Sequence, residues 1–175
     1  MARKAISKRE KIQKIRQLRS LLKADLDKQI LSIDPATNSG WAFSISEYGT
    51  KKLKKSKKEH MGHKLIEFEH WVRFMMKKSD LVVTELPVTR YAAATIHHSK
   101  LVGIIEKVAA EFSKPYFVFD PKTVKKFATG SGVASKIDMI EQAKKVFGYV
   151  GEDDNEVDAI WLLLFCKQKL LKNES

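Results

Sequence analysis

The sequence predicts an α/β fold: a five-stranded mixed sheet with helices on both faces. Two observations lead to this prediction. Three runs with strand character follow one another closely after residue 28, which favours three antiparallel strands. Two further apolar runs each come after a helical pattern, which favours two strands reached through helical crossovers. A chain of 175 residues can bury a true core, and we expect one compact domain with one appended element.

The first three strands are expected between residues 29 and 58. Residues 29–34 form an apolar run typical of a buried strand, and residues 40–46 alternate with a period of two. The turn signal EYGT then precedes a lysine-rich stretch, residues 51–58, which can form the third strand. Lysine on an edge strand deters pairing with other chains. We therefore expect residues 51–58 to form a solvated edge strand. Because the whole chain is basic, we also expect these lysines to contact phosphate.

The next elements alternate between helix and strand. Apolar residues recur every three or four positions from Met61 to Met75, which predicts an amphipathic helix facing the core. Residues 80–86 are a β-branched run and predict a fourth strand that ends near Glu85. Residues 92–112 have a helical pattern, and residues 114–120 predict the fifth strand.

Short helices are expected from residue 121 onward. Ser135 can cap a helix that starts at Lys136, and Asp138 completes a box-like start three residues later. The last helix is expected from about Asp154 to Leu171, with a middle that is apolar on nearly all sides. Three tryptophans are expected in the core: Trp41, Trp71 and Trp161.

Charge and cysteine content narrow the function classes. The chain has 33 Lys and Arg against 21 Asp and Glu, a formal charge of +12 and a pI near 9.7, which attracts nucleic acid first and anionic membranes second. The single cysteine, Cys166, excludes a disulfide framework and a cysteine metal site. The sequence has neither a run of about 18 apolar residues nor a secretory signal, so we expect a cytoplasmic protein with no membrane segment.

More than half of the excess charge lies in residues 1–28, which contain ten Lys or Arg and three acidic residues. Apolar residues recur among them at helical spacing and predict a basic amphipathic helix: Ile12, Ile15, Leu18, Leu22 and Leu26. This helix could lie on DNA, on a membrane surface or on the rest of the protein. We expect residues 1–28 to form an arm attached to a domain of residues 29–175.

Acidic side chains follow two of the predicted strands. Asp34 ends the first strand and Glu85 ends the fourth. If these strands are parallel neighbours, both carboxylates emerge at the edge of the sheet where an open α/β sheet has its crevice. Two like charges buried close together are costly without a cation or a shifted pKa. Taken alone, Asp34 could equally be a turn residue before Pro35.

The last helix offers a third acidic group. Asp154 and Asp158 are four residues apart and share one helix face, and Asn155 lies nearly on the same face. Oxygen ligands without cysteine or histidine at ligand spacing indicate a hard cation, Mg²⁺ or Mn²⁺. Acidic residues also favour helix N-termini for electrostatic reasons, and Glu152 and Asp153 are expected to do only that.

Taken together, these segments resemble the RuvC family of Holliday junction resolvases, which has an RNase H-like fold. The matching segments are IDPATNSGWA with Asp34, VVTELP with Glu85, and DNEVDAI at the start of the last helix. A further match is VKKFATGSGVASK, in which four positions recur at the family's intervals: Lys125, Gly130, Gly132 and Lys136. The resemblance covers roughly residues 29–171. It leaves out the arm, which looks like the extension of a phage-type relative.

The resemblance implies a homodimeric, Mg²⁺-dependent endonuclease that nicks two strands of branched DNA symmetrically, in the host cytoplasm if phage-encoded. The substrate would be a four-way junction and could include three-way branches. Two Mg²⁺ ions, replaceable by Mn²⁺, would be held by Asp34, Glu85 and Asp158. The family has an acid or histidine three residues before the last aspartate, where this chain has Asn155. We expect Asp154 to be the fourth carboxylate, with Asn155 as a neutral ligand or an orienting residue.

The resemblance also carries over residues that would contact DNA. Lys125 and Lys136 are expected near the scissile phosphate, where Lys136 would offset developing charge. Both could instead be solvated helix residues. The backbone amides of the loop between them, at Gly130, Ser131 and Gly132, could cradle a neighbouring phosphate.

The loop after Glu85 is expected to recognise the branch point. It contains Arg90 and Tyr91, and an aromatic ring there could stack on a splayed base. Tyr91 could equally pack at the start of the following helix. His97 and His98, which have no partners at ligand spacing, are expected at the surface or at a dimer contact.

Two other functions remain open from the sequence. The first is a non-catalytic protein of the same fold that binds branched DNA, an interpretation favoured by Asn155 at the family's acidic position. The second is a nuclease of the same fold that acts on RNA/DNA hybrids or on three-way and flapped branches. A dimer would favour four-way junctions over these, because such junctions offer two equivalent sites that match a twofold axis.

Overall fold

The computed structural model describes residues 7–24, 26–53, 60–87 and 92–173. They form one five-stranded sheet in the order β3-β2-β1-β4-β5. The strands are β1 (Ile30–Asp34), β2 (Asn38–Ala42), β3 (Tyr48–Lys52), β4 (Leu81–Glu85) and β5 (Tyr116–Phe119). The first three are antiparallel, whereas β1, β4 and β5 are parallel neighbours. The predicted fold class, with three antiparallel and two parallel strands, is confirmed.

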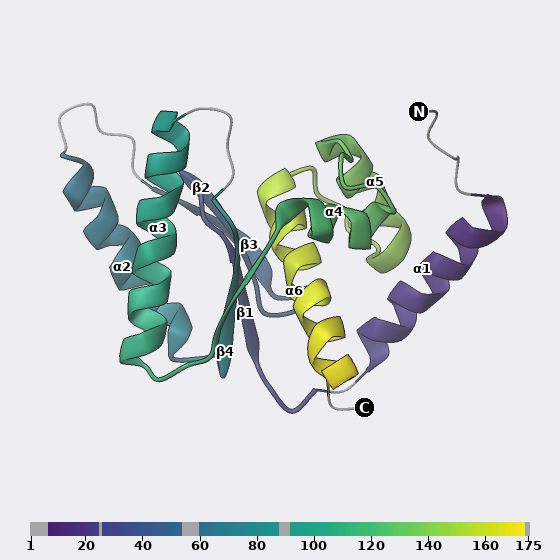
Figure 1. Cartoon of the computed structure of the whole chain (residues 1–175), viewed down its shortest axis with the longest axis horizontal. Coiled ribbons are helices and arrows are strands. Elements are labelled where there is room, and N and C mark those ends of the chain that lie inside the picture. Colours follow the sequence, from purple (N-terminus) through teal and green to yellow (C-terminus); the bar gives the residue numbers. More distant parts are fainter. Residues whose placement is uncertain (1–6, 25, 54–59, 88–91, 174–175) are drawn as a thin grey trace.

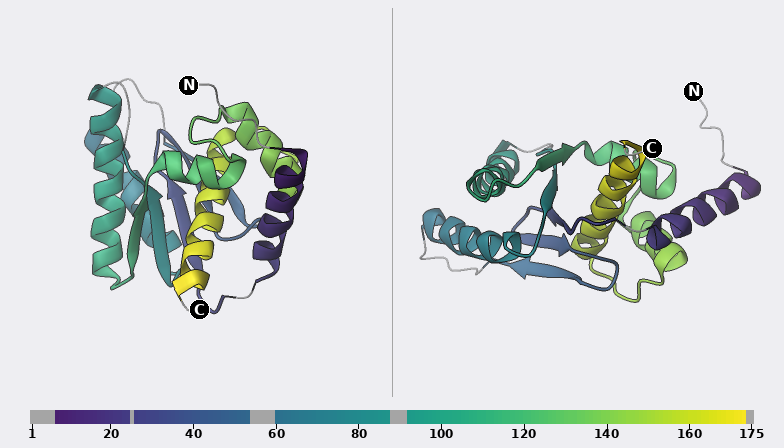
Figure 2. Two further views of the ribbon diagram at one scale, coloured as in Figure 1. Left: turned by 45° about the vertical axis from the view of Figure 1, so that its right-hand side comes forward. Right: turned by 90° about the horizontal axis from the view of Figure 1, so that it is seen from below.

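Helices cover both faces of this sheet, as Figures 1 and 2 show. The helices are α1 (Lys8–Lys23), α2 (Met61–Met76), α3 (Ala92–Glu111), α4 (Pro121–Thr129), α5 (Lys136–Phe147) and α6 (Asp154–Asn173). Helices α2 and α3 lie on one face, and α4, α5 and α6 lie on the other. No helix in the described part of the chain has an apolar stretch long enough to cross a membrane.

Each face of the sheet has its own apolar core. Leu31 and Ile33 of β1 pack with α2 and α3, whereas Ile30 belongs to the core on the side of α6. Since side chains alternate along a strand, Ser32 and Asp34 share the α6 face with Ile30. Trp161 is fully buried in the α6 core, as predicted. Trp41 and Trp71 pack against the other core but remain partly exposed.

The third strand begins earlier than predicted. Expected within residues 51–58, after a turn at EYGT, it instead spans Tyr48–Lys52 and includes three residues of that turn signal. The Ser44 side chain accepts hydrogen bonds from the backbone N–H groups of Ser46 and Glu47, which fixes the turn over residues 44–47. Most of the lysine-rich stretch therefore follows the strand, and residues 54–59 lie outside the described part.

The ends of the helices follow local sequence signals. The predicted start of α5 is confirmed, because Ser135 Oγ accepts from Asp138 N–H while the Asp138 carboxylate accepts from Ser135 N–H. Asp120 caps α4 and is followed by Pro121 in the first turn. Gly130 ends α4 with φ of 92°, a left-handed conformation that favours glycine.

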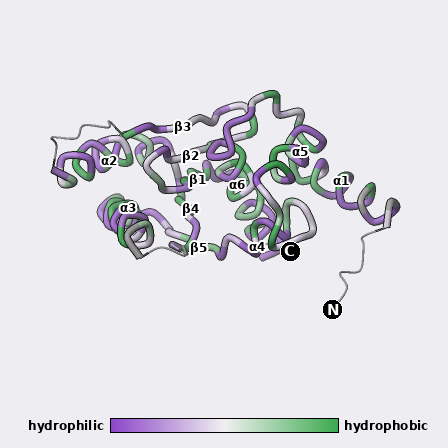
Figure 3. The backbone as a smooth tube through the Cα atoms, turned by 90° about the horizontal axis from the view of Figure 1, so that it is seen from above, coloured by the Kyte–Doolittle hydropathy of each residue, from purple (hydrophilic) through white to green (hydrophobic). Residues whose placement is uncertain are grey.

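Helix α1 packs on α5 and α6, on the side of the molecule away from α2 and α3 (Figure 3). Leu18 and Leu21 are 3% and 8% exposed and join the α6 core. Arg19 donates hydrogen bonds to the carbonyl groups of Lys145 and Val146, at the end of α5. The predicted basic amphipathic helix is therefore present, and it lies on the rest of the protein. The division into residues 1–28 and 29–175 stays a prediction.

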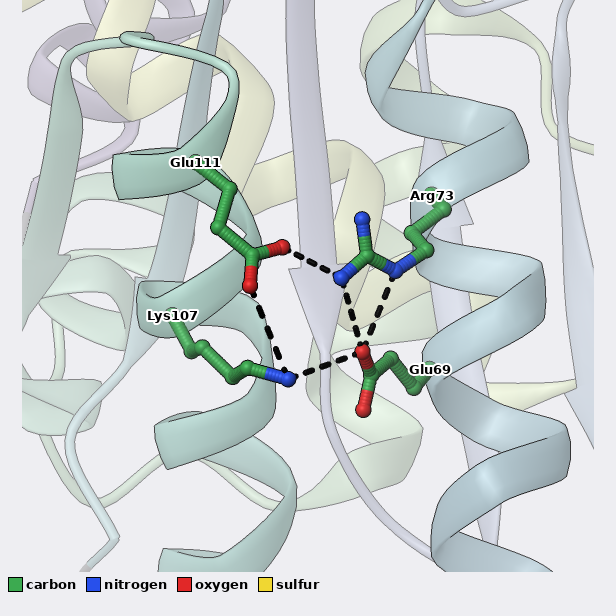
Figure 4. A network of polar contacts seen from close by, with 4 residues as sticks. All are labelled: Glu69, Arg73, Lys107 and Glu111. Carbon is green, nitrogen blue, oxygen red and sulfur yellow. Dashed lines mark hydrogen bonds and ion pairs between the residues drawn. The ribbon is translucent and has the colours of Figure 1, made fainter.

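A four-residue ionic network joins α2 to α3 (Figure 4). Arg73 of α2 donates to Glu69 on its own helix and to Glu111 of α3. Lys107 of α3 lies 3.0 Å from Glu69 and 3.6 Å from Glu111. Hydrogen bonds from Lys107 and Arg73 lower the pKa of Glu69, so the network holds its carboxylate in the charged form.

We expect Leu18→Ala to lower the free energy of unfolding by about 2 to 4 kcal/mol, because it removes buried apolar volume between α1 and the core. Urea denaturation measures this loss. Ile12→Ala on the same helix is the matched control, since Ile12 is 46% exposed and should change stability little. Equal, small effects of both substitutions would contradict the packing of α1.

Candidate functional site

The site begins at the carboxyl ends of two parallel strands. In the register of β1 and β4, Ile33 lies opposite Thr84, so the next residues, Asp34 and Glu85, lie side by side. Adjacent strands are about 4.8 Å apart. Glu85 shares the α6 face with Val83, as Asp34 does with Ser32. Two half-buried carboxylates therefore meet at one edge of the sheet, on the face that α6 covers.

Helix α6 adds two further carboxylates to this edge. Ser32 Oγ donates to the carbonyl oxygen of Ala159 at 2.8 Å, which ties α6 to the strand that carries Asp34. Asp158 precedes Ala159, and Asp154 lies one helical turn earlier on the same face. The charges of both aspartates act on Asp34 or on its neighbour Glu85. Acidic side chains from three separate segments thus lie close enough for their charges to act on one another.

The start of α6 lies directly on β2. A Cβ atom at Gly40 would come within 1.8 Å of the Asn155 carbonyl oxygen, so only glycine fits there. Gly40 is also the antiparallel partner of Asp34 in the sheet. The missing side chain therefore lets the first turn of α6 approach the strand pair that carries Asp34, and this approach positions Asp154 and Asp158.

Burial and mutual repulsion raise the pKa values of three of these carboxyl groups. Burial, followed by the charge of Asp154, raises the pKa of Asp34 to about 6. Burial, followed by the charges of Asp34 and Asp158, raises the pKa of Glu85 to about 9. Burial and the charge of Asp34 raise the pKa of Asp158 to about 7. The site holds its carboxylates against repulsion and favours a cation or a proton among them.

Two lysines supply positive charge at the same place. Lys136, the first residue of α5, forms an ion pair with Asp154, and this hydrogen bond is the main reason why the pKa of Lys136 is raised. The charge of Lys125 of α4 acts on Asp34, Glu85 and Asp158 and lowers their pKa values. Both predicted lysines therefore lie beside the carboxylates.

Asn155 is turned towards Asp153. Its backbone N–H and its side-chain amide both donate to Asp153 Oδ1, at 3.0 and 2.7 Å. The other carboxylate oxygen of Asp153 accepts from Thr50 Oγ1 of β3 at 2.8 Å. Asp153, which the sequence suggested only as a helix-terminal charge, also connects the start of α6 to the sheet and orients Asn155.

The loop between α4 and α5 has fewer free amides than expected. Gly130 N–H donates to the carbonyl of Lys126, and Ser131 N–H donates to Thr129 Oγ1. Gly132 passes close to the carbonyl oxygen of Lys122, 3.1 Å from where a Cβ atom would lie. The left-handed backbone at Gly130 and the close packing at Gly132 therefore explain why these two residues are glycines. Contact of this loop with DNA stays a prediction. Arg90 and Tyr91 lie outside the described residues.

One acidic residue near the site was missed from the sequence. Asp120 follows β5, whose Phe119 lies opposite Glu85, and its charge contributes to the raised pKa of Glu85. Its carboxylate accepts hydrogen bonds from Thr123 N–H and Oγ1, which identifies it as the cap of α4. The aspartate-proline pair after a strand, which also occurs at Asp34, could have indicated this position.

The donor chemistry of the site suits a hard divalent cation. Asp34, Glu85, Asp154 and Asp158 offer carboxylate oxygens only, the ligands preferred by Mg²⁺ and Mn²⁺. Within the described residues, no three acidic, histidine or cysteine side chains are already gathered around one metal position. Lys136 occupies Asp154 instead and supplies the positive charge there. Its side chain is 72% exposed.

Comparison with solved structures identifies the architecture. Thermus thermophilus RuvC in complex with a Holliday junction matches with a TM-score of 0.65 and 17% identity, over 80% of this chain and 95% of that one. This chain has the RuvC fold. A second structure of RuvC from the same organism matches with a TM-score of 0.63 and 17% identity, over 82% and 96% of the two chains.

Sequence comparison agrees with this fold. The crossover junction endodeoxyribonuclease RuvC of Pseudothermotoga lettingae is 26% identical over 131 residues, which cover 66% of this chain and 77% of that protein. No family model matches the sequence. The predicted resemblance to RuvC is confirmed, whereas the phage-type origin of the arm stays a prediction.

We expect Gly40→Ala to lower the free energy of unfolding by about 2 kcal/mol or more, because the new methyl group overlaps the Asn155 carbonyl. Thermal and urea denaturation measure this loss. Gly103→Ala in α3 is the control, because no atom lies within 4 Å of a Cβ atom there and alanine is the better helix former. A tolerated Gly40→Ala would contradict the close approach of α6 to β2.

Without divalent cations, Glu85→Gln should stabilise the protein at pH 8, on the order of 2 kcal/mol. The raised pKa means that the folded state binds the Glu85 proton more tightly than the unfolded state, so stability falls as pH rises from about 4.5 towards 9. Glutamine removes this loss, and its advantage should shrink by pH 5. Urea denaturation in EDTA at both pH values tests this, with the exposed Glu141→Gln as control. An equal gain at both pH values would contradict it.

Proposed function

We propose that this chain is a structure-selective endonuclease that resolves Holliday junctions and other branched DNA by paired, metal-dependent cleavage of phosphodiester bonds. The observation that carries this proposal is the convergence of four carboxylates and two lysines at the carboxyl edge of a sheet with the RuvC fold. The net charge of +12 suits a polyanionic substrate. The name of the relative and the Holliday junction in the matching structure support the same substrate class.

We propose Mg²⁺ as the cofactor, with two ions per site and Mn²⁺ as a substitute. Asp34, Glu85, Asp154 and Asp158 would hold them, since these side chains converge and repel one another. When bound, such cations supply electrophilic stabilisation of the charge that develops on the phosphate. The engagement of the Asn155 side chain by Asp153 favours Asp154 as the fourth carboxylate, with Asn155 in an orienting role.

The lysines would act on the DNA. Release of Asp154 by Lys136 would leave an exposed ammonium group beside the carboxylates, where it can offset negative charge on the reacting phosphate. Lys125 is half-buried and its charge already reaches three of the carboxylates, so it would hold the centre together and attract the backbone. The loop of Gly130, Ser131 and Gly132 links the helices that carry these lysines and would pass near the DNA.

We propose that two copies of the chain act together. A four-way junction has two equivalent strands to cut, and a twofold-symmetric dimer places one site at each. Arg90 and Tyr91 follow β4 and Glu85 along the chain, and we propose that they contact the branch point. His97 lies within 3.4 Å of Thr37, in the turn after Asp34, so the helix that follows this loop is connected to the site.

The decisive experiment compares the native chain with Asp34→Asn on synthetic four-way, three-way and linear duplex DNA, with Mg²⁺ and with EDTA. The native chain should cut the four-way junction at two symmetrical positions in Mg²⁺ alone. Asp34→Asn should cut at least about 10³-fold more slowly and still bind, because it loses a carboxylate at the centre but no positive charge. Gel electrophoresis measures cleavage, and fluorescence anisotropy measures binding.

The matched control is Asp27→Asn, which makes the same change at an exposed position before β1. It should cut like the native chain. Binding without cleavage by the native chain in Mg²⁺, Mn²⁺ and other divalent ions would favour the non-catalytic function instead. Preferential cutting of three-way branches or RNA/DNA hybrids would favour a nuclease of the same fold with a different substrate.

A further inference from the structure

Helix α1 presents an exposed face that carries two arginines. Arg9, Gln13 and Arg16 are exposed and recur at the i, i+4, i+7 spacing of one helix face. Among the described residues, neither arginine has a carboxylate partner. This face lies opposite Leu18 and Leu21, which bury the other side of α1 against the core.

A second basic position lies where α1 meets α4, on the side of α1 that Leu18 and Leu21 share. Lys14 Nζ donates to the carbonyl of Lys126 at 2.8 Å, which joins α1 to the end of α4. Burial, followed by the charge of Lys126, lowers the pKa of Lys14. Two ammonium groups are thus held near each other, and neither has a carboxylate partner within the part of the chain that the structure describes. An anion between them would relieve this repulsion.

A groove separates α1 from α4 and α6 beside these lysines. It has a volume of about 370 Å³, and its lining comprises two apolar residues, Leu18 and Phe127, and five polar ones: Glu10, Gln13, Lys14, Gln17 and Gln168. Amide and ammonium donors are the groups that contact phosphate oxygens and sugars in DNA complexes. The chemistry of the groove therefore fits a nucleic-acid backbone.

Helix α4 connects this surface to the candidate cleavage centre. Lys125 and Lys126 are adjacent, so their side chains point about 100° apart around the helix. The charge of Lys125 acts on Asp34, Glu85 and Asp158, while Lys126 lies near Lys14. One helix thus presents a lysine to the carboxylates and another to α1. Figure 2 shows α1 and α4 on the same side of the sheet.

We propose that α1, together with Lys126, is a second phosphate-binding surface that grips a duplex arm of the branched DNA outside the cleavage centre. This proposal rests on the proposed function for the identity of the DNA, and it adds a contact made by this chain's own arm. Helix α1 has 16 residues and is about 24 Å long, which corresponds to about seven base pairs of duplex. The surface would therefore touch an arm only if that arm extends far enough from the branch point.

The test measures how affinity depends on salt. Binding of the full-length chain to two four-way junctions, whose arms differ by about eight base pairs, is measured by anisotropy in EDTA so that nothing is cut. Each phosphate contact adds about 0.9 to the slope of log affinity against log salt. For the native chain, longer arms should raise this slope by about two. For Arg9→Gln/Arg16→Gln, longer arms should leave it unchanged. Between 50 and 200 mM salt, this difference corresponds to about tenfold in affinity.

A matched pair, Lys77→Gln/Lys78→Gln, removes the same charge from two exposed positions directly after α2, on the side of the molecule away from α1 (Figure 3). It should keep the native dependence on arm length. Thermal denaturation confirms that both variants are folded. A native slope that does not change with arm length, or an equal loss in both pairs, overturns the proposal. If Arg9→Gln/Arg16→Gln loses binding to anionic vesicles but keeps the native dependence of the DNA slope on arm length, the proposal is overturned in favour of a membrane-binding surface.

The same data separate this proposal from the proposed function. If the native chain cuts four-way junctions but its salt slope does not depend on arm length, the proposed function stands and the proposed α1 surface is wrong. If the native chain cuts no DNA but its salt slope depends on arm length, the proposed function is wrong and the α1 surface belongs to a non-catalytic DNA-binding protein. Since the salt measurement is made in EDTA, it does not depend on the divalent cation.

Discussion

Repulsion among half-buried carboxylates is the constraint on which this structure depends. Asp34 and Glu85 are forced together because β1 and β4 are parallel neighbours that end in register. The charge of Asp34 raises the pKa values of both Glu85 and Asp158, the residue that α6 adds to the same edge. Such a cluster lowers the stability of the protein above neutral pH unless positive charge is brought to it. Lys125 and Lys136 bring part of that charge, and an all-oxygen donor set leaves room for divalent cations to bring the rest.

The helices around the site hold these charges against their repulsion. Gly40 lets α6 lie directly on β2, and Ser32 fastens the next turn of α6 to β1. Asp153 joins the start of α6 to Thr50 of β3. None of these contacts touches a carboxylate of the centre, yet together they fix where the centre lies. The electrostatic repulsion between Asp34 and Asp158 is therefore opposed by packing and hydrogen bonds that neighbouring residues make.

The sequence predicted what local patterns determine and missed what tertiary contacts determine. The carboxylates at the strand ends, the capping box of Ser135 and Asp138, and the amphipathic helix of the arm follow from residue spacing alone. The third strand was misplaced because the turn lies earlier than EYGT. The side chain of Ser44 fixes it over residues 44–47. The contact between Gly40 and Asn155 joins residues far apart in the chain, and no pattern in the sequence indicates it.

Helix α1 has consequences for the site although it lies outside the resemblance to RuvC. It donates hydrogen bonds to the last carbonyls of two helices, from Lys14 to α4 and from Arg19 to α5. Cations at helix C-termini are favourable, because the helix dipole is negative there. These two helices carry Lys125 and Lys136, the lysines that balance the carboxylates. The arm therefore helps to place the two lysines beside the carboxylates of the site.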